Sequence, residues 1–320
     1  MTVADLVSPR RMPGAQSTAT SFLRSRPAIE RIAWRVVLGI ALVLSAFWIL
    51  GFYVDEVARY LFVDAHIYFR ATQAWLEGSN PWTTSYLGVP FAAIPPTLLL
   101  NVPFIPFGEG FAVTFWAAAN TAAVVLLIRR LHLPLWVVVL QPVLEGWLSG
   151  SPDLALAGAI VLGLGWIAAL TKPYSAPALI ADRRWLQIGV AAVVAIITIP
   201  FLPWFIFYES RTILAESFAN FAGNPVSAAG SPVLIVAVVV ALVSLGWRRG
   251  SALFTPGLLA QQPHYIVFSL ETVVASRILS LAMTIPVTHA AAVGVIVYAL
   301  VERWRTTLAP KPVPGGLEPA

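Results

Sequence analysis

Residues 33–54, AWRVVLGIALVLSAFWILGFYV, form an apolar run in which Arg35 is the only charged residue. A helix crossing a hydrocarbon core about 30 Å thick needs roughly 20 apolar residues, so this run is long enough to span a bilayer. It is also too long and too far from the N-terminus for a cleaved signal peptide. Six further runs approach or exceed the length of a span: 111–128, 133–148, 152–170, 186–207, 232–247 and 279–301. The pattern predicts an all-α, polytopic transmembrane bundle.

Composition favours the same class of protein. Hydrophobic residues make up 58% of the 320-residue chain and charged residues only 11%, and the mean hydropathy is +0.81. A soluble domain usually carries about 25% charged residues, so the polar side chains here are too few to cover a water-facing surface. The chain has no cysteine, which excludes disulfides, thiolate metal sites and cysteine nucleophiles. No spacing of His and carboxylate residues suggests a metal site, and we expect no cofactor.

The positive charges lie at the ends of the apolar runs. The net charge is +5, which in a soluble protein would raise the question of nucleic acid, but no basic stripe with interleaved aromatics is present. Short basic clusters beside spans are instead typical of cytoplasmic loops. We therefore expect two mobile cytoplasmic tails, residues 1–30 and 306–320, around a transmembrane domain of residues 31–305. The clusters include Arg129–Arg130, Arg183–Arg184, Arg248–Arg249 and, near the C-terminus, Arg303 and Arg305.

Residues 55–91 form the longest polar interval between spans and the predicted first external loop. Within it Tyr68, Ala71 and Trp75 fall at helical spacing with polar residues between them, which predicts an amphipathic helix on the membrane surface. The sequence Gly-Ser-Asn-Pro at 78–81 ends this helix, because glycine favours a helix C-terminus and proline cannot continue a helix.

The number of spans depends on the proline-rich residues 92–107. If this stretch crosses, the bundle has about ten spans, Arg129–Arg130 lies outside, and Lys172 lies outside with Asp64. If the stretch dips in and returns, there are about eight spans, Arg129–Arg130 lies inside, and Lys172 lies inside as well. We favour the first arrangement because residues 92–107 are apolar enough to cross, and the second stays open.

Five short segments carry a family resemblance. They are DAHIYFRATQAWLEGSNPW (64–82), IPPTL (94–98), PFIP (103–106), GSPD (150–153) and TKPY (171–174). In this order they resemble motifs of glycosyltransferase family 87, the polyprenol-phosphate-mannose-dependent mannosyltransferases and their relatives. The resemblance covers roughly residues 60–300.

The chain departs from the family pattern at two points. Ser151 stands where the family has Gln. The family's late Ser/Thr-Pro…His segment is matched only loosely, by Thr255-Pro256 and His264.

The resemblance implies a C-type membrane glycosyltransferase fold. It implies an inverting enzyme that transfers a sugar, with mannose as the expected one, from a polyprenyl-phosphate donor to a lipid or glycan acceptor at the outer face. A bacterial plasma membrane is the implied location, with both termini in the cytoplasm. The partners would be the donor, the acceptor and membrane lipids, with no nucleic acid. The sequence predicts no oligomeric state.

The resemblance also assigns residues. Asp64 matches the catalytic aspartate and would act as the general base. The departing lipid phosphate gains negative charge and needs cationic or hydrogen-bond donors. The candidates for donor phosphate or substrate binding are Tyr68, Arg70, Lys172, Arg211 and His264.

All of these residues except Tyr68 also have a purely structural explanation. Asp64 can cap the surface helix, and Lys172 can extend from a span end to the interface. Arg70 can contact lipid phosphates, Arg211 can be a surface residue, and His264 can be buried in a packed interior.

Further acidic residues and functions also stay open. Glu145 and Asp153 can belong to the site or be paired inside the bundle. The alternative functions are a transporter, or a catalytically inactive scaffold of the same fold.

Overall fold

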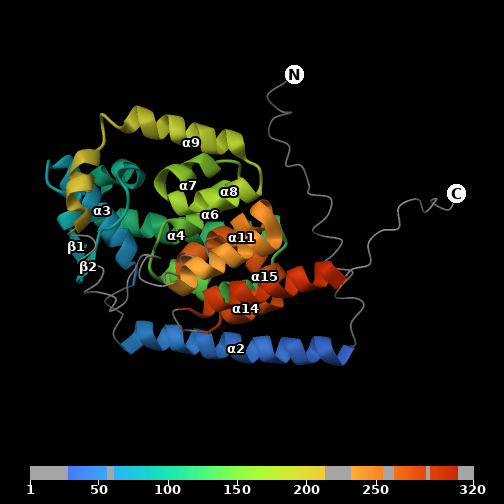
Figure 1. Ribbon diagram of the computed structural model, residues 1–320. Coiled ribbons are helices and arrows are strands. Elements are labelled where there is room, and N and C mark those ends of the chain that lie inside the picture. The colour runs from blue at the N-terminus through green and yellow to red at the C-terminus, as the bar shows by residue number, and fades with distance from the viewer. Residues whose placement is uncertain (1–27, 56–60, 213–231, 255–262, 286–288, 309–320) are drawn as a thin grey trace, which may run out of the picture.

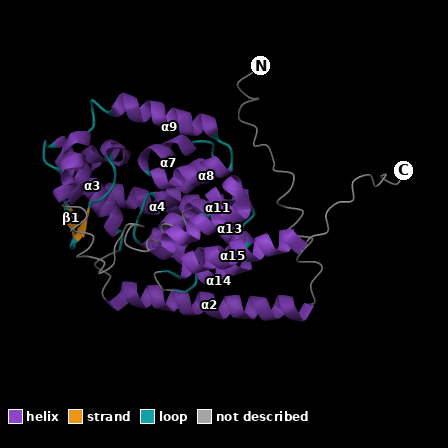
Figure 2. Ribbon diagram, viewed as in Figure 1, coloured by secondary structure: helices purple, strands orange, loops and turns teal. Residues whose placement is uncertain are grey.

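The computed structural model describes residues 28–55, 61–212, 232–254, 263–285 and 289–308, and most of them are helical (Figures 1 and 2). The longer helices are α2 (Ala28–Asp55), α3 (Val63–Leu76), α4 (Glu109–Leu131), α9 (Trp185–Thr198), α11 (Pro232–Ala252) and α15 (Ala290–Leu308). The shorter helices are α5 (Gln141–Leu148), α6 (Asp153–Val161), α7 (Gly165–Thr171), α8 (Ala176–Ala181), α13 (Leu270–Ala275) and α14 (Arg277–Ala282). The 3-10 helices are η2 (Pro81–Thr83), η3 (Pro95–Leu100), η4 (Val102–Phe107), η5 (Leu135–Val139), η6 (Pro173–Ser175) and η8 (Pro263–Ser269). The strands β1 (Ser85–Tyr86) and β2 (Val89–Pro90) pair antiparallel as a small hairpin.

Three helices of the described ranges are long and apolar enough to cross a membrane: Ile32–Gly51, Glu109–Leu131 and Pro232–Ala252. The third is not a continuous rod. Gly246 has φ 75° and ψ 168°, which breaks the helix, and a Cβ at Gly250 would lie 2.7 Å from Leu242 Cα. The chain therefore folds back after Gly246. The helical class is confirmed, whereas the expected eight to ten spans stay a prediction.

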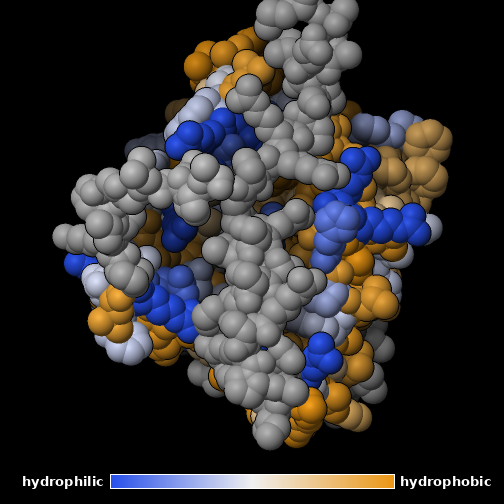
Figure 3. Space-filling view, turned by 90° about the vertical axis from the view of Figure 1, so that its right-hand side faces the viewer, coloured by the Kyte–Doolittle hydropathy of each residue, from blue (hydrophilic) through white to orange (hydrophobic). Residues whose placement is uncertain are grey.

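The molecule has two distinct ends. In Figure 1, α3 and the β1–β2 hairpin lie at the left, and the described ends of α2 and α15 that lead to the two termini lie at the right. At the right end, one pocket is lined by Arg184, by Glu271 and by Leu131, which is the last residue of α4. We call the left end the α3 end and the right end the arginine end. The arginine end is defined by Arg129, Arg130, Arg183, Arg184, Arg248, Arg249, Arg303 and Arg305. Figure 3 looks at this end and shows groups of hydrophilic side chains among hydrophobic ones.

Residues 92–107 do not form a spanning helix. They contain η3 and η4, which are separated at Asn101 and pack against α3. The following helix α4 begins with Glu109, which pairs with Arg70 of α3. The chain thus leaves the α3 end and returns to it, as in the arrangement that dips and returns.

The segment after α4 runs back and forth on short helices. Helix α5 ends beside Phe62 at the start of α3, α6 runs to the arginine end where Arg184 bonds to Ile160 O, and α7 returns to Lys172. At 1.5 Å per residue, the nine residues of α6 and seven of α7 reach only about 14 and 10 Å. The apolar run 152–170 is therefore two short helices, separated where Gly163 has φ +86°.

The outward faces of the helices are apolar. Ile40, Leu44 and Phe47 of α2 are 57%, 64% and 73% exposed, and Leu186 and Ile196 of α9 are 77% and 65% exposed. Water-soluble monomers rarely expose contiguous apolar patches of this kind. This surface suits contact with lipid and explains why the apolar composition does not all enter the protein interior.

Candidate functional site

The start of α3 is fixed to the end of α5. Phe62 N donates to Leu148 O and Asp64 N donates to Ser149 O, both at 2.8 Å. The next residue, Gly150, has φ +70°, and a Cβ there would lie 3.1 Å from Phe62 Cα and from Ala65 Cβ. Only glycine meets both requirements easily. The turn that follows α5 is thereby held against the first turn of α3, which carries Asp64.

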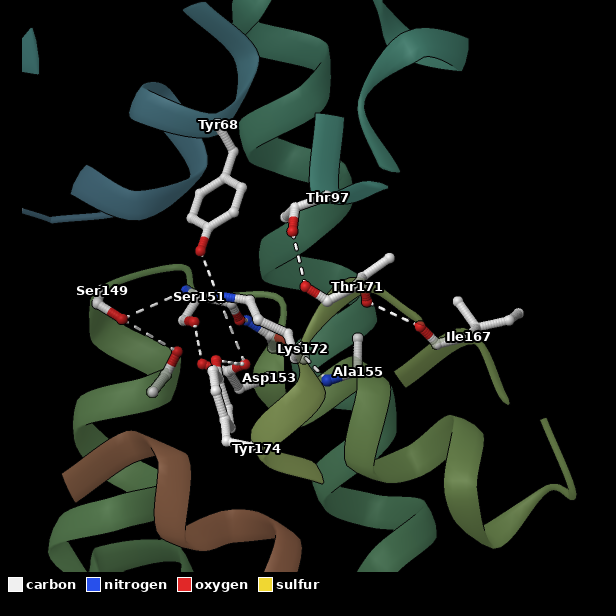
Figure 4. A network of polar contacts seen from close by, with 12 residues as sticks. Tyr68, Thr97, Ser149, Ser151, Asp153, Ala155, Ile167, Thr171, Lys172 and Tyr174 are labelled. Carbon is white, nitrogen blue, oxygen red and sulfur yellow. Dashed lines mark hydrogen bonds and ion pairs between the residues drawn. The ribbon is translucent and has the colours of Figure 1, made fainter. Parts of the chain in front are cut away.

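Asp153 is the centre of a buried polar network (Figure 4). It lies in the first turn of α6 and is 0% exposed. Ser151 Oγ donates to its Oδ2 at 2.6 Å, and Tyr174 OH donates to its Oδ1 at 2.8 Å. A buried carboxylate is costly unless it is hydrogen-bonded and paired. Its two hydroxyl donors come from the turn before α6 and from η6.

Lys172 provides the positive charge of this network. It follows α7 directly and is 3% exposed. Its Nζ lies 3.8 Å from Asp153 Oδ1 and donates a hydrogen bond to Tyr68 OH. The same ammonium lies 4.7 Å from the centroid of the Tyr68 ring and 5.6 Å from that of the Tyr174 ring. One carboxylate and two aromatic rings therefore surround the buried charge.

Tyr68 connects this network to α3. Burial raises the pKa of its phenol well above the usual value, and the nearby carboxylates of Asp153 and Asp64 raise it further. The phenol is therefore neutral at physiological pH, so it can accept from Lys172 and still donate its own proton. Asp64 lies four residues before Tyr68, one helical turn along the same face.

The network lies well away from the start of α4. Asn120, the central residue of the 23-residue α4, donates to Ser151 O at 2.8 Å and accepts from Ala155 N at 3.1 Å. Eleven residues of helix place Asn120 about 16 Å from Glu109. If α4 crosses a bilayer, the charged pair sits near mid-depth, where an ionisable group is by default a functional candidate.

Arg70 lies in a different cluster. Glu109 Oε1 accepts from Arg70 Nε and from His66 Nδ1, both at 2.7 Å. The Tyr86 ring of the hairpin stacks on His66 at 4.6 Å, and Arg70 lies 4.5 Å from its centroid. These contacts join α3, α4 and the β1–β2 hairpin. Arg70 is thus neutralised by a carboxylate and is not part of the Lys172 network.

The other two predicted phosphate-binding residues are Arg211 and His264. Arg211 lies apart from this network. Arg211 is exposed, and its guanidinium lies 3.9 Å from the Tyr208 ring centroid and donates to Tyr208 O. The backbone of His264 belongs to η8, which packs against α5 and α6. The side chain of His264 lies outside the described residues, so its role stays a prediction.

The structure brings together three of the predicted residues: Asp64, Tyr68 and Lys172. Residues 92–107 return to the α3 end, as in the eight-span arrangement, and yet Lys172 contacts Tyr68 of α3, as expected only for the ten-span arrangement. Neither predicted arrangement contained this combination. Sequence reasoning left Asp153 undecided and did not select Tyr174 for the site. The TKPY motif at 171–174 was the available signal, because it contains both the ammonium and one hydroxyl of the network.

A second polar site lies far from this one. At the arginine end, a pocket is lined by Asp182, Arg184 and Glu271 together with apolar residues. Arg184 Nε pairs with Asp182 Oδ2 at 3.3 Å. Arg184 also binds the end of α6, whereas Asp153 is at its beginning, so the pocket and the network are separated by the length of that helix.

Among the residues that the structure describes, no group of three or more His or carboxylate side chains lies close enough together to hold a metal ion. Comparison with known proteins gives no match to any family model, curated protein or solved structure. The resemblance to family 87 therefore rests on the order of the short motifs.

Proposed function

We propose that this chain is an integral-membrane, inverting glycosyltransferase that takes its sugar, mannose in the first instance, from a polyprenyl-phosphate donor. The single observation that carries this proposal is the meeting of the motif at 64–82 with the motif at 171–174. Tyr68, one turn after Asp64, binds Lys172. A base and a cation for a leaving phosphate thereby stand on adjoining elements.

The proposed reaction uses these groups in one displacement. A hydroxyl of the lipid or glycan acceptor attacks C1 of the sugar, and the bond from C1 to the phosphate oxygen breaks with its electron pair going to the phosphate. Asp64 takes the hydroxyl proton as general base. Lys172 and the Tyr68 hydroxyl stabilise the charge that builds up on the phosphate, in a site with little water.

The proposed location follows from charge. The arginine end carries eight of the basic residues named above, and the positive-inside rule assigns such an end to the cytoplasm. The α3 end then lies at the outer face, beside the donor's lipid chain in the bilayer. The exposed apolar faces of α2 and α9 are the surfaces that would contact lipid.

The test is transfer of radiolabelled mannose from polyprenyl-phosphate-mannose to candidate acceptors by the purified protein in nanodiscs. We expect Asp64→Asn to lower the rate by about 100-fold or more, the usual effect of losing a positioned base. Glu77→Gln is the matched control, since Glu77 is an exposed carboxylate just beyond the same helix. Equal transfer by wild type and Asp64→Asn would overturn the base assignment, and no transfer by wild type with any lipid-linked donor would overturn the function.

One observation favours the transporter alternative. The Asp153–Lys172 pair lies near the middle of α4, and buried charges at such a depth also mark ion and solute paths in transporters. Flux of a solute through the protein in proteoliposomes, together with no sugar transfer, would select this alternative. If the protein shows no solute flux and no sugar transfer, whether or not it binds the donor, the inactive scaffold is selected.

A further inference from the structure

Asp153 has a position that the transfer reaction does not by itself require. It is fully buried and accepts hydrogen bonds from Ser151 and Tyr174. Lys172 Nζ, at 3.8 Å from Oδ1, is its cationic partner.

The direction of the Lys172 side chain depends on the groups that its ammonium contacts. The residue sits just after α7 with φ −133° and ψ 82°, outside the helical region, and its N–H donates to Ala168 O at 2.7 Å. A lysine stem has four rotatable carbons and a mobile charged head. Asp153 is held in one orientation by two hydroxyl donors from different elements, and its charge attracts the ammonium to the position where it reaches Tyr68.

From these contacts we propose that Asp153 is a positioning residue, which holds the Lys172 ammonium against Tyr68 so that the cation faces the phosphate of the lipid-linked donor. This inference rests on the proposed function for the identity of the anion. Asp153 takes no proton from the acceptor and does not contact the sugar. Ser151 and Tyr174 support it by fixing its two oxygens.

The chain allows a direct measurement of the Lys172 environment. Lys172 and Lys311 are the only lysines in the sequence, so amine labelling followed by mass spectrometry reports on Lys172 with an internal reference in the same molecule. Removing the carboxylate leaves the buried ammonium without the partner that holds it, so the side chain leaves its buried position more often and meets the labelling reagent. We expect Asp153→Asn to raise the labelling rate of Lys172 relative to Lys311 by about tenfold.

The second measurement is binding of farnesyl phosphate to the full-length protein in nanodiscs, with farnesol as the uncharged comparison. We expect Asp153→Asn to weaken farnesyl phosphate binding by about tenfold and to leave farnesol binding unchanged, because only the phosphate needs an oriented cation. In the transfer assay the same variant should raise the donor KM and also lower kcat, because Lys172 both binds the donor phosphate and stabilises the charge that the phosphate gains. Asp182→Asn is the matched control, as it removes another ion-paired aspartate at the arginine end and should change none of these values.

Tyr174→Phe provides a milder test in case the Asp153→Asn protein does not fold. It removes one hydrogen bond to Oδ1 and keeps the charge, so it should shift Lys172 labelling in the same direction by a smaller factor. Unchanged Lys172 labelling in both variants, or unchanged farnesyl phosphate binding in Asp153→Asn, would overturn the positioning role. If the wild type transfers no sugar, the proposed function fails, while labelling and phosphate binding still decide whether Asp153 positions Lys172 for an anion.

Discussion

Lys172 and Tyr68 lie 104 residues apart in the chain and are joined by a hydrogen bond from the Lys172 ammonium to the Tyr68 hydroxyl. This contact links the helix that carries Asp64 to the short helices α6 and α7. It also places a buried positive charge against a residue that lies one helical turn after the proposed base. The stability of this arrangement and its consequences can be tested separately from catalysis.

Loss of the Lys172 charge should destabilise the fold. Lys172→Met leaves Asp153 buried without its cation, a change that typically costs about 3–5 kcal/mol. Adding Asp153→Asn to this variant should recover part of the loss, because the carboxylate is then no longer uncompensated. Thermal unfolding in detergent micelles measures both. Arg305→Gln, at the exposed pair with Glu302, is the control and should cost about 1 kcal/mol or less. A Lys172→Met protein as stable as the control variant would contradict the buried pair.

Gly150 should be needed for the docking of α3. Gly150→Ala combines a strained φ of +70° with a Cβ only 3.1 Å from Phe62 Cα, and we expect a loss of about 2–3 kcal/mol. Gly78→Ala is the matched control, because Gly78 has φ +79° but nothing within 4 Å of an added Cβ. It should lose only about 1 kcal/mol. The difference in unfolding free energy isolates the contact with α3, and equal losses would argue against that contact.

The contacts of Glu109 with Arg70 and His66 should stabilise the β1–β2 hairpin, because Tyr86 packs on both residues. Glu109→Gln weakens the bonds to Arg70 and His66, so amide hydrogen exchange of residues 85–90 should become faster. The Arg70 side chain is 42% exposed, so the effect should be about 1 kcal/mol or less and should shrink in high salt. Glu77→Gln should leave this exchange unchanged. Equal exchange in all three proteins would show that Tyr86 stacking alone holds the hairpin.

Asp182 should make stability fall as pH rises from acid toward neutral. Burial raises the pKa of its carboxyl, although the charges of Arg184 and Arg248 oppose the shift. The folded state then binds the proton more tightly than the unfolded state. The resulting stabilisation is complete below the ordinary pKa of 3.8 and is lost as pH rises through the raised value. Thermal unfolding of Asp182→Asn between about pH 4 and pH 7 should show a flatter dependence than wild type. A steeper dependence in the variant would contradict the assignment.

The orientation in the membrane can be tested because the chain has no cysteine. Glu77→Cys at the α3 end should react with a membrane-impermeant maleimide in intact cells. Arg303→Cys at the arginine end should react only after permeabilisation, since the positive-inside rule places that end in the cytoplasm. Labelling in the reverse pattern would invert the proposed topology and move Asp64 to the cytoplasmic side.

The sequence by itself determined the helical class, the apolar surface and the polar segment that begins at Asp64. Hydropathy and helical spacing are local properties, and they act on each run of residues independently. They also identified α3 closely, because Tyr68, Ala71 and Trp75 repeat with the period of a helix. The end of α3 before Gly78 follows from the same local rules.

Only the tertiary structure decided which polar residues meet. Lys172 reaches Tyr68 because Gly163 divides an apolar run into two short helices. Residues 92–107 return as two 3-10 helices that meet at Asn101. Asp153 joins the site because its charge, once buried, has to be paired, and Lys172 is the ammonium that the fold brings within reach. Hydropathy alone cannot distinguish a short pair of helices from one span, since both are equally apolar. The position of Arg70 likewise depends on Glu109, 39 residues away, and no local pattern connects these two residues.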